Sequence, residues 1–490
     1  RQMCIRDRFR YYMKKTAFIL LIIFAFYYKS FAAAAIIKSE IDINLNMIKG
    51  SITITSTKAE TVTVSLYHDM QLLSSDKRVK YNKNRNEYTI SLDGLSPVIL
   101  SYIKNITDTS DTISKDFISI YSSIVPAVTN IENAELYINI PENFQGLASQ
   151  FVTFNKNENT MLFTYNSLPE NIYFAASSNY IVKKITQNHI DIYTLLFKEH
   201  ENLSYKLLQK AAYYIEIYEN LFVSHFPYHN FIVVEDVNPY GHALASMAVF
   251  GSSIIDKDFV AERSLGHEVL HQWFGAAIES SMADGNFLEA ITTYFSDYFY
   301  EKDDRIKYRK DILIKYQAYA AAKSFPLKEF IYNAGKKEQS IGYGKGLMVL
   351  HMAKNKAGDD AFMAGIRKFI NDKLYSTASW KDLLSYIGMD NDFYTNWILS
   401  KDNIILAVNN VSFQNKILSF NLIRKGGEDE INIPFTHISE NNAVTGKFKI
   451  KTGVNQIVYN LKSDNDTFII DDRYDLMLSL IHISEPTRPR

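Results

Sequence analysis

The sequence predicts a multidomain α+β protein with an N-terminal all-β domain, a mainly helical middle domain and a small C-terminal β-sandwich. The chain has 490 residues, more than one hydrophobic core usually serves. Its apolar residues follow a two-residue period near both ends and a helical period between them. Hydrophobic residues make up 47% of the chain and there are only 10 prolines, a composition that is typical of globular proteins rather than disordered or fibrous ones.

The segment 36–182 alternates apolar and polar residues between polar turns, as in "IDINLNM", "SITITS" and "TVTVSLY". Such alternation is typical of antiparallel sheets with one face in water. Because successive strand side chains point to opposite faces, we expect Ile41, Ile43 and Leu45 to face the same side. An all-β N-terminal domain follows from this pattern.

The segment 183–402 is predicted to be mainly helical. Apolar residues recur at helical spacing from Leu203 to Phe222, and Pro227 is expected to stop that helix near its end. A short strand, "FIVVED", comes next. Amphipathic helices are predicted for "DDAFMAGIRKFINDKL" and "SWKDLLSYIG", the second with Ser379 as its N-cap.

Alternation returns over 403–478, in "SFQNKILSFNLI", "GKFKIKT" and "DTFIIDD". Short alternating strands separated by polar turns are typical of a β-sandwich. We expect a small one here.

The two ends of the chain call for separate treatment. Residues 1–12 and 479–490 resemble translated sequencing-adaptor sequence and are set aside. Residues 13–35 have the positive start, apolar run and small residues of a secretory signal peptide. The apolar run, Thr16 to Tyr28, has 13 residues. A membrane anchor needs roughly 20. We therefore expect an exported protein, periplasmic or extracellular, without a stable membrane anchor after cleavage.

Charge and cysteine content narrow the possible partners. The sole cysteine, Cys4, lies in the segment set aside, so no disulfide framework is expected. The formal charge is −1, and removal of the first 31 residues (+6) and the last twelve (+1) leaves −8. An acidic protein is a poor match for nucleic acid or an anionic membrane.

The stretch "SLGHEVLHQWFG" carries His267 and His271 four residues apart, with Glu268 beside the first. On a helix this spacing aims both imidazoles at one point. Zinc hydrolases need two such nitrogens, a third protein ligand, an open position for water and a carboxylate that takes the water's proton. Zinc lowers the pKa of its bound water to about 7. The motif indicates two metal ligands and a general base, Glu268; the alternative is an ordinary buried helix with two histidines.

This motif's combination of a helix and a neighbouring carboxylate is absent at His225, His229, His242 and His351. In "HFPYH", His225 and His229 have the same spacing, but Pro227 disrupts a helix and no carboxylate follows the first histidine. We expect a surface turn there. His242 and His351 lack such partners, so we expect structural roles for both.

The third ligand is predicted to be Glu289, in "GNFLEAITTYFSDY". It follows a turn built on Asp284 and Gly285 and begins a second helical pattern. A carboxylate presented from a neighbouring antiparallel helix would complete a His, His, Glu set. The alternative is a solvated surface glutamate.

With the later "GYGKGLMVLHM", these segments resemble the gluzincin zinc aminopeptidases of the membrane alanyl aminopeptidase type. The resemblance covers about residues 36–478 and implies a thermolysin-like catalytic domain over 183–402, one zinc ion and a peptide or protein substrate. It implies a zinc-dependent metallopeptidase in which zinc is held by His267, His271 and Glu289, Glu268 is the base, and Tyr343 stabilises the tetrahedral oxyanion. Tyr343 lies between Gly342 and Gly344, where we expect the backbone to approach substrate closely.

Two features depart from the family pattern. Seventeen residues separate His271 from Glu289, one fewer than usual. We interpret this as a one-residue deletion in the connecting loop, since the Gly-Asn-aromatic-x-Glu version resembles a divergent exported branch of the family. Ala290, at the usual spacing, cannot bind a metal, which leaves Glu289 as the candidate. The family's G-x-M-E-N strand, whose glutamate holds the substrate's amino group, corresponds to "YGHALASM", which has Leu244 in the glutamate's place. Low-ranked substrate-binding candidates on this strand are Tyr240, Gly241, His242 and Ala243.

Several alternatives stay open. Glu235 or Asp236 would replace the missing glutamate if the strand register differed, so aminopeptidase and endopeptidase action are both possible. Thr293, one turn after Glu289, is either a support for a ligand histidine or a plain helix-surface residue. The chain is alternatively a catalytically inactive surface binding protein that retains the fold. An ester or epoxide hydrolase on the same centre has no specific support.

Overall fold

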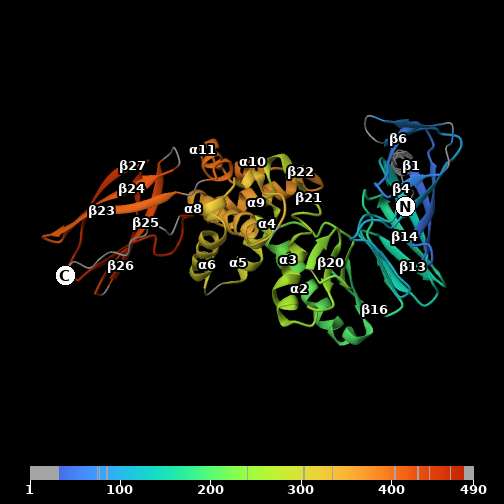
Figure 1. Cartoon of the computed structure of the whole chain (residues 1–490), viewed down its shortest axis with the longest axis horizontal. Coiled ribbons are helices and arrows are strands. Elements are labelled where there is room, and N and C mark those ends of the chain that lie inside the picture. Colours follow the sequence, from blue (N-terminus) through green and yellow to red (C-terminus); the bar gives the residue numbers. More distant parts are fainter. Residues whose placement is uncertain are drawn as a thin grey trace, which may run out of the picture. The chain divides into compact units, whose positions relative to one another are not determined.

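The computed structural model describes residues 33–478 except 74, 75, 77, 84–86, 240, 302, 303, 334, 402, 403, 427–429, 441 and 464. The chain divides into two compact units, Arg1–Val182 and Lys183–Arg490 (Figure 1). Both segments set aside at the chain ends, and the signal-peptide prediction up to residue 32, lie outside the described residues. Residues 33–35, which the sequence placed at the end of the signal peptide, begin the first strand.

The described part of the first unit is built from strands, which confirms its all-β prediction. They form a seven-stranded sheet of order β13-β14-β11-β1-β2-β7-β4 and two four-stranded sheets, β10-β3-β6-β5 and β12-β15-β9-β8. The strands are β1 (Ala33–Asp42), β2 (Met47–Thr55), β3 (Ala59–Ser65), β4 (Met70–Leu72), β5 (Val79–Asn82), β6 (Glu87–Asp93), β7 (Val98–Asn105), β8 (Thr112–Ile113), β9 (Phe117–Ile120), β10 (Ala127–Val128), β11 (Ile131–Asn139), β12 (Gln145–Ala148), β13 (Thr153–Asn157), β14 (Thr160–Ser167) and β15 (Phe174–Ser177).

The expected alternation at the start of this unit holds only in part. It holds within β1, where Ile37, Ser39 and Ile41 are buried while Lys38 and Glu40 between them are exposed. The prediction that Ile43 and Leu45 continue this face is wrong, because the strand ends at Asp42. The Asp42 Oδ1 accepts hydrogen bonds from the backbone N–H groups of Asn44 and Leu45, which closes a turn and leaves Leu45 exposed.

The second unit begins with a five-stranded sheet of order β16-β17-β18-β20-β19. Strands β17, β18 and β20 run parallel, and β19 pairs antiparallel to β20 at the edge of the sheet. The strands are β16 (Tyr180–Gln187), β17 (Ile190–Phe197), β18 (Asn230–Asp236), β19 (Gly241–Leu244) and β20 (Met247–Gly251). The strand expected from "FIVVED" is β18.

Helices fill the middle of this unit, as the helical period predicts (Figure 1). They are α2 (Ser204–Phe222), α3 (Leu265–Leu270), α4 (Leu288–Phe295), α5 (Asp297–Tyr300), α6 (Arg305–Tyr319), α7 (Lys336–Gln339), α8 (Gly346–Ala357), α9 (Asp359–Lys373), α10 (Trp380–Tyr386) and α11 (Asn391–Tyr394). Shorter turns of 3₁₀ or π geometry are η1 (Lys198–Leu203), η2 (Val260–Ser264), η3 (Met282–Asp284), η4 (Ala321–Lys323), η5 (Leu327–Glu329), η6 (Ser340–Lys345) and η7 (Thr395–Leu399), and two short strands, β21 (Ile278–Ser280) and β22 (Ser376–Ala378), pair in parallel.

Two helix ends show how local sequence sets these elements. Helix α2 ends at Phe222 with Val223 in the left-handed conformation at φ 54°, four residues before Pro227. Helix α10 begins with a capping box, in which Ser379 and Asp382 each accept a hydrogen bond from the other's backbone. The predicted N-cap is confirmed.

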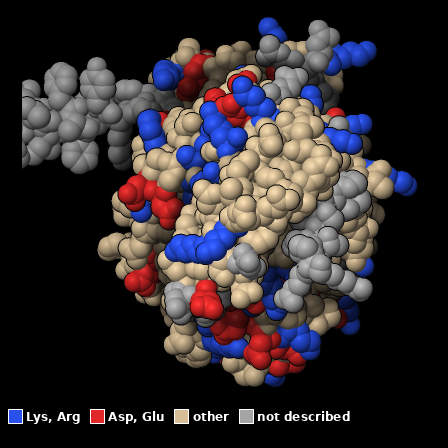
Figure 2. All heavy atoms as spheres, turned by 90° about the vertical axis from the view of Figure 1, so that its left-hand side faces the viewer, with Lys and Arg blue, Asp and Glu red and all other residues tan. Residues whose placement is uncertain are grey.

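The C-terminal strands form two three-stranded antiparallel sheets, β23-β24-β27 and β26-β25-β28. Their bounds are β23 (Ile405–Gln414), β24 (Ile417–Lys425), β25 (Ile431–Ser439), β26 (Asn442–Ile450), β27 (Gly453–Asn460) and β28 (Thr467–Ile470). Figure 2 views the molecule from the side of these strands. It shows an area without charged residues, bordered by both basic and acidic side chains. Buried residues of these strands, among them Leu406 and Leu422, belong to the same hydrophobic cluster as the helices.

Within the ranges listed above, no helix is long and apolar enough to cross a membrane.

Candidate active site

The motif helix is short and is held by tyrosines from α2. It consists of the π turn η2 followed by α3, and His271 is its C-cap. Tyr214 donates hydrogen bonds to the carbonyls of Ala261 and Glu262, and Tyr218 donates to that of Gly266. A Cβ on Gly266 would lie 2.8 Å from the Tyr214 ring, so this glycine lets the helix pack closely on α2.

Helix α4 presents Glu289 to the same place. The turn before it uses Gly285 at φ 80°, where a Cβ would lie 2.3 Å from the Leu327 carbonyl oxygen. Asn286 then accepts a hydrogen bond from the backbone N–H of Leu288 and donates one to the Ile331 carbonyl. The predicted turn at Asp284 and Gly285 is confirmed, and Glu289 is not a solvated surface residue.

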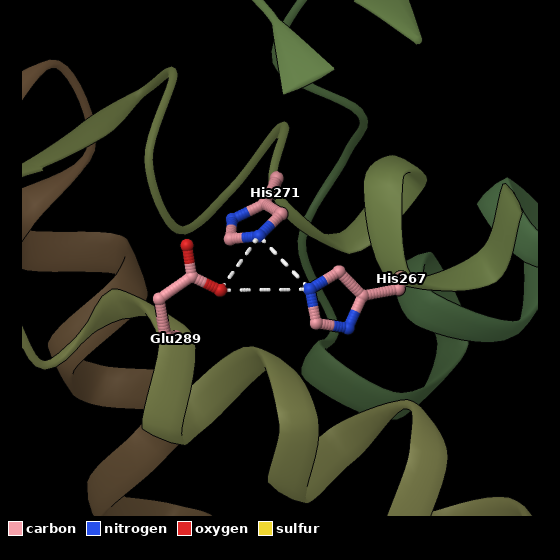
Figure 3. A group of neighbouring side chains, drawn as sticks. All are labelled: His267, His271 and Glu289. Carbon is pink, nitrogen blue, oxygen red and sulfur yellow. Dashed lines mark hydrogen bonds and ion pairs between the residues drawn. The ribbon is translucent and has the colours of Figure 1, made fainter. Parts of the chain in front are cut away.

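The side chains of His267, His271 and Glu289 converge (Figure 3). The two Nε2 atoms lie 3.1 Å apart, and Glu289 Oε2 lies 3.6 Å from that of His267 and 3.4 Å from that of His271. Among the described residues, these three side chains form a group whose possible metal-ligand atoms all lie within 4.8 Å of one another. A tetrahedral ion with bonds of about 2.0–2.1 Å separates its ligand atoms by about 3.3 Å, which these distances match.

The electrostatics of the cluster also favour a cation. Glu289 Oε2 is buried and lies next to the Nε2 atoms of both histidines. Burial opposes ionisation of Glu289, but the charges and hydrogen bonds of His271 and His267 outweigh it and hold its pKa well below the usual range. Burial likewise opposes a positive charge on His267, yet hydrogen bonds to Asp297 and Glu289 raise its pKa. The carboxylates therefore stabilise positive charge at this point, which a divalent cation would supply.

Each histidine is oriented from its far side. His267 Nδ1 lies 3.2 Å from Asp297 Oδ2 and 3.2 Å from Ser296 Oγ. His271 Nδ1 lies 2.8 Å from the Phe274 carbonyl oxygen, and Thr292 Oγ1 is 3.4 Å away. Donation from Nδ1 to these oxygens leaves the Nε2 lone pairs for a metal.

Thr293 has neither role that the sequence suggested. Its hydroxyl is buried and has no hydrogen-bond partner, so it does not hold a histidine and does not lie on a helix surface. The neighbouring Thr292 and the later Ser296 and Asp297 are the polar residues near the rings. Helical spacing did not predict the contact of Asp297 with His267. The backbone turns sharply at Ser296, with φ −103° and ψ −87°, between α4 and α5.

Glu268 and Tyr343 lie beside the cluster. Glu268 is buried, and burial raises its pKa against the opposing charges of His267 and His271. Tyr343 lies on η6 and is half-buried. Burial raises its pKa, and so do the charge of Glu289 and a side-chain hydrogen bond with it. All five residues of the predicted hydrolytic centre thus lie together.

The glycines flanking Tyr343 do not serve the purpose expected of them. A Cβ on Gly342 would lie 2.2 Å from the Phe330 ring, and one on Gly344 would lie 3.2 Å from Ile312. They make room for the protein's own side chains rather than for substrate. Phe330 in turn packs edge-on against the Tyr343 ring, with centroids 6.2 Å apart.

The predicted substrate strand is the edge strand β19. Tyr240 lies outside the described residues, while Gly241, His242, Ala243 and Leu244 form the strand. Burial lowers the pKa of His242, so its ring is neutral at neutral pH.

The two acidic residues of β18, which the sequence offered as replacements for the missing glutamate, are both buried. Glu235 is fully buried, with its carboxylate accepting from the Phe197 N–H and pairing with His200 Nδ1 at 2.7 Å. Asp236 is also buried and accepts from the Asn238 N–H. Both carboxylates are held within the protein.

The other histidines behave as expected. His225 and His229 are exposed in the turn after α2. His351 is buried, with its Nε2 2.9 Å from Asp475 Oδ1.

Part of the chain is similar in sequence to known peptidases. Residues 207–403 match the peptidase family M1 domain. The chain is 25% identical over 254 residues to a Tricorn protease-interacting factor F2 of Thermoplasma volcanium, covering 46% of this chain and 32% of that protein. It is 24% identical over 213 residues to a probable aminopeptidase 1 of Saccharolobus solfataricus, covering 39% and 27%. It is 27% identical over 162 residues to a leucyl aminopeptidase of the same organism, covering 29% and 20%.

The matched part is about a third or less of the length of each of these relatives. The residues that match the family M1 domain, 207–403, contain the motif helix, the Glu289 helix and Tyr343. Together, the matched domain and the aminopeptidase relatives support a peptidase of family M1.

Proposed function

We propose that this protein is an exported zinc metallopeptidase that hydrolyses peptide bonds in an aminopeptidase-like site. The observation that carries the proposal is the convergence of His267 Nε2, His271 Nε2 and Glu289 Oε2 at separations that suit a tetrahedral ion. Three protein ligands leave a fourth position for water, which is the arrangement of catalytic rather than structural zinc sites. Bound zinc would act as a Lewis acid and lower the pKa of its water to about 7.

The protein's own residues supply the remaining chemistry. Glu268 accepts the proton of the attacking water and returns it to the leaving amine, a role that suits a buried carboxyl with a raised pKa. Tyr343, whose hydroxyl stays protonated, donates a hydrogen bond to the oxyanion of the tetrahedral intermediate. Strand β19 offers an open edge along which an extended peptide adds as a further strand.

The decisive test is Glu268→Gln, which keeps the size of the side chain and removes the base. We expect loss of peptide hydrolysis by a factor of about 10³ or more with zinc still bound, measured on a peptide library by mass spectrometry. Glu279→Gln, an exposed substitution on β21, is the matched control. Undiminished hydrolysis in the Glu268 variant would exclude this mechanism. A wild-type protein that cleaves no peptide would favour the alternative of an inactive surface binding protein.

A separate experiment tests whether cleavage occurs at the substrate's N-terminus or within the peptide. The same library with free and with acetylated N-termini distinguishes the two modes of cleavage, because an aminopeptidase requires a free amino group. Cleavage blocked by acetylation assigns aminopeptidase action despite Leu244. Cleavage of both sets assigns endopeptidase action.

Export after cleavage of residues 13–35 is the last part of the proposal and rests on the sequence pattern. Mass spectrometry of the N-terminal peptide from secreted and cell-associated fractions tests it. An N-terminus within that segment would contradict the expected cleavage site.

A further inference from the structure

Gln272 directly follows His271 and is fully buried. Its side-chain Oε1 accepts a hydrogen bond of 2.7 Å from the Ser246 N–H. Its Nε2 lies 3.1 Å from the Leu244 carbonyl oxygen, 3.2 Å from that of Met247 and 3.2 Å from that of Glu268. One amide therefore joins the motif helix to the turn between β19 and β20.

The turn that Gln272 holds ends the edge strand β19. Ser246 is buried in the left-handed conformation at φ 60°, and its carbonyl accepts a hydrogen bond of 2.9 Å from the Ile232 N–H of β18. Among the described strands, β19 pairs with β20 at the edge of the sheet. The sheet ladder alone therefore does not set the distance between this strand and the motif helix.

On the motif helix, the Gln272 side-chain amide contacts the backbone carbonyl of Glu268, the residue assigned as the base. The backbone N–H of Gln272 donates to the Val269 carbonyl, three residues back. The Glu268 carbonyl, at the end of the short helix α3, accepts from the Gln272 side chain instead. The backbone carbonyls of Glu268 and Leu244 are thus partners of one nitrogen.

We propose that Gln272 is a positioning residue that sets the separation of strand β19 from Glu268, and so the register in which an extended peptide is presented for hydrolysis. The inference rests on the proposed function. It requires a side chain that donates and accepts at once, which a glutamine amide does. Glutamate keeps only the acceptor, and methionine keeps the length with neither group.

The test compares wild-type protein with Gln272→Met and Gln272→Glu. Thr293→Val is the control, because it alters a buried hydroxyl that has no hydrogen-bond partner. Hydrogen exchange with mass spectrometry reports the protection of residues 241–247, independently of catalysis. Steady-state kinetics on an eight-residue internally quenched peptide separate KM from kcat. Bound zinc and the thermal midpoint are measured for each variant.

We expect both Gln272 variants to exchange about tenfold faster over 241–247 and to raise KM about tenfold, with a smaller change in kcat and unchanged zinc. Wild-type exchange and KM in a folded variant would overturn the proposal. A fall in kcat with unchanged KM and exchange would also overturn it, since Gln272 would then act on Glu268 alone. If wild-type protein cleaves no peptide, the proposed function fails, and the exchange measurement still decides whether Gln272 holds β19.

Discussion

At the scale of single residues, Glu268 and Glu289 belong to one cluster yet differ in environment. Glu289 faces both histidines, and their charges hold its pKa low. Burial dominates at Glu268 and raises its pKa. Carboxyl groups whose pKa values are driven apart are typical of sites in which one group binds and the other moves protons.

Glu289→Gln tests the binding role. An amide is a weaker, neutral ligand, so we expect the variant to lose most of its zinc on dialysis and its hydrolytic activity with it. Metal analysis by mass spectrometry measures the zinc, and Glu279→Gln serves again as the control. Full zinc content in Glu289→Gln would remove this residue from the ligand set.

Tyr343→Phe tests oxyanion stabilisation. Loss of one donor to the transition state is expected to lower kcat by a factor of about 10²–10³ with little change in KM or zinc content. Tyr332→Phe, at an exposed position, is the control. An unchanged kcat would show that the hydroxyl has no part in the reaction.

At the scale of elements, the break between α4 and α5 organises the surroundings of the site. Because the helix ends at Phe295 and restarts at Asp297, Ser296 and Asp297 both come within 3.2 Å of His267 Nδ1. A continuous helix would have kept the next turn of residues on fixed helical faces. The break therefore creates a carboxylate–histidine pair on the side of His267 that faces away from Glu289.

Asp297→Asn is expected to weaken zinc affinity by about 10–100-fold, because the neutral amide no longer orients His267 or raises its basicity. Competition with a chromogenic chelator measures the affinity. Asp311→Asn, on the exposed side of α6, is the control. Equal affinities would show that Ser296 alone orients the ring.

At the scale of the whole molecule, the C-terminal strands and the helices of the second unit are joined by a buried polar network. Arg309 donates to the carbonyls of Arg473 and Tyr474 and to Tyr298, and lies 3.2 Å from Asp475. Asp475 also contacts His351. These contacts and the shared hydrophobic cluster explain why the two regions form one compact unit.

Arg309→Lys removes most of these hydrogen bonds while keeping the charge. We expect it to reduce the free energy of unfolding by about 2–4 kcal/mol, since buried carbonyls lose their donors. Urea unfolding followed by fluorescence measures the change. Lys307→Gln, at an exposed position on the same helix, should change it by less than about 0.5 kcal/mol. Equal effects of the two substitutions would contradict the role of Arg309.

The same region predicts a pH effect. Burial raises the pKa of Asp471 to about 8, well above the ordinary value of an aspartate. The folded state therefore holds this proton more tightly than the unfolded state, and its contribution to stability is lost as pH rises through about 8. Asp471→Asn should raise the thermal midpoint at pH 8 relative to wild type, with the gain vanishing near pH 4. A gain that does not depend on pH would contradict this.

Several features that depend on residues close together in the sequence agree with their predictions. Capping by Ser379, the end of α2 near Phe222 and the turn before Glu289 all depend on neighbouring residues, and all were predictable. Ile43 and Leu45 were misassigned because Asp42 closes a turn that the two-residue period conceals. Gly342 was misread because its neighbour Phe330 lies in a different segment.

The sequence by itself determined the chemistry of the centre: His267 and His271 face one point because four residues make about one helical turn, and Glu268 follows from its place beside the first. The contacts that support the centre depend on how distant segments pack. Asp297 reaches His267 through a break in a helix, and Gln272 joins the base to the edge strand. The physical reason is that helical spacing follows from local backbone geometry, whereas the partner of a buried polar group depends on which distant segments pack against it.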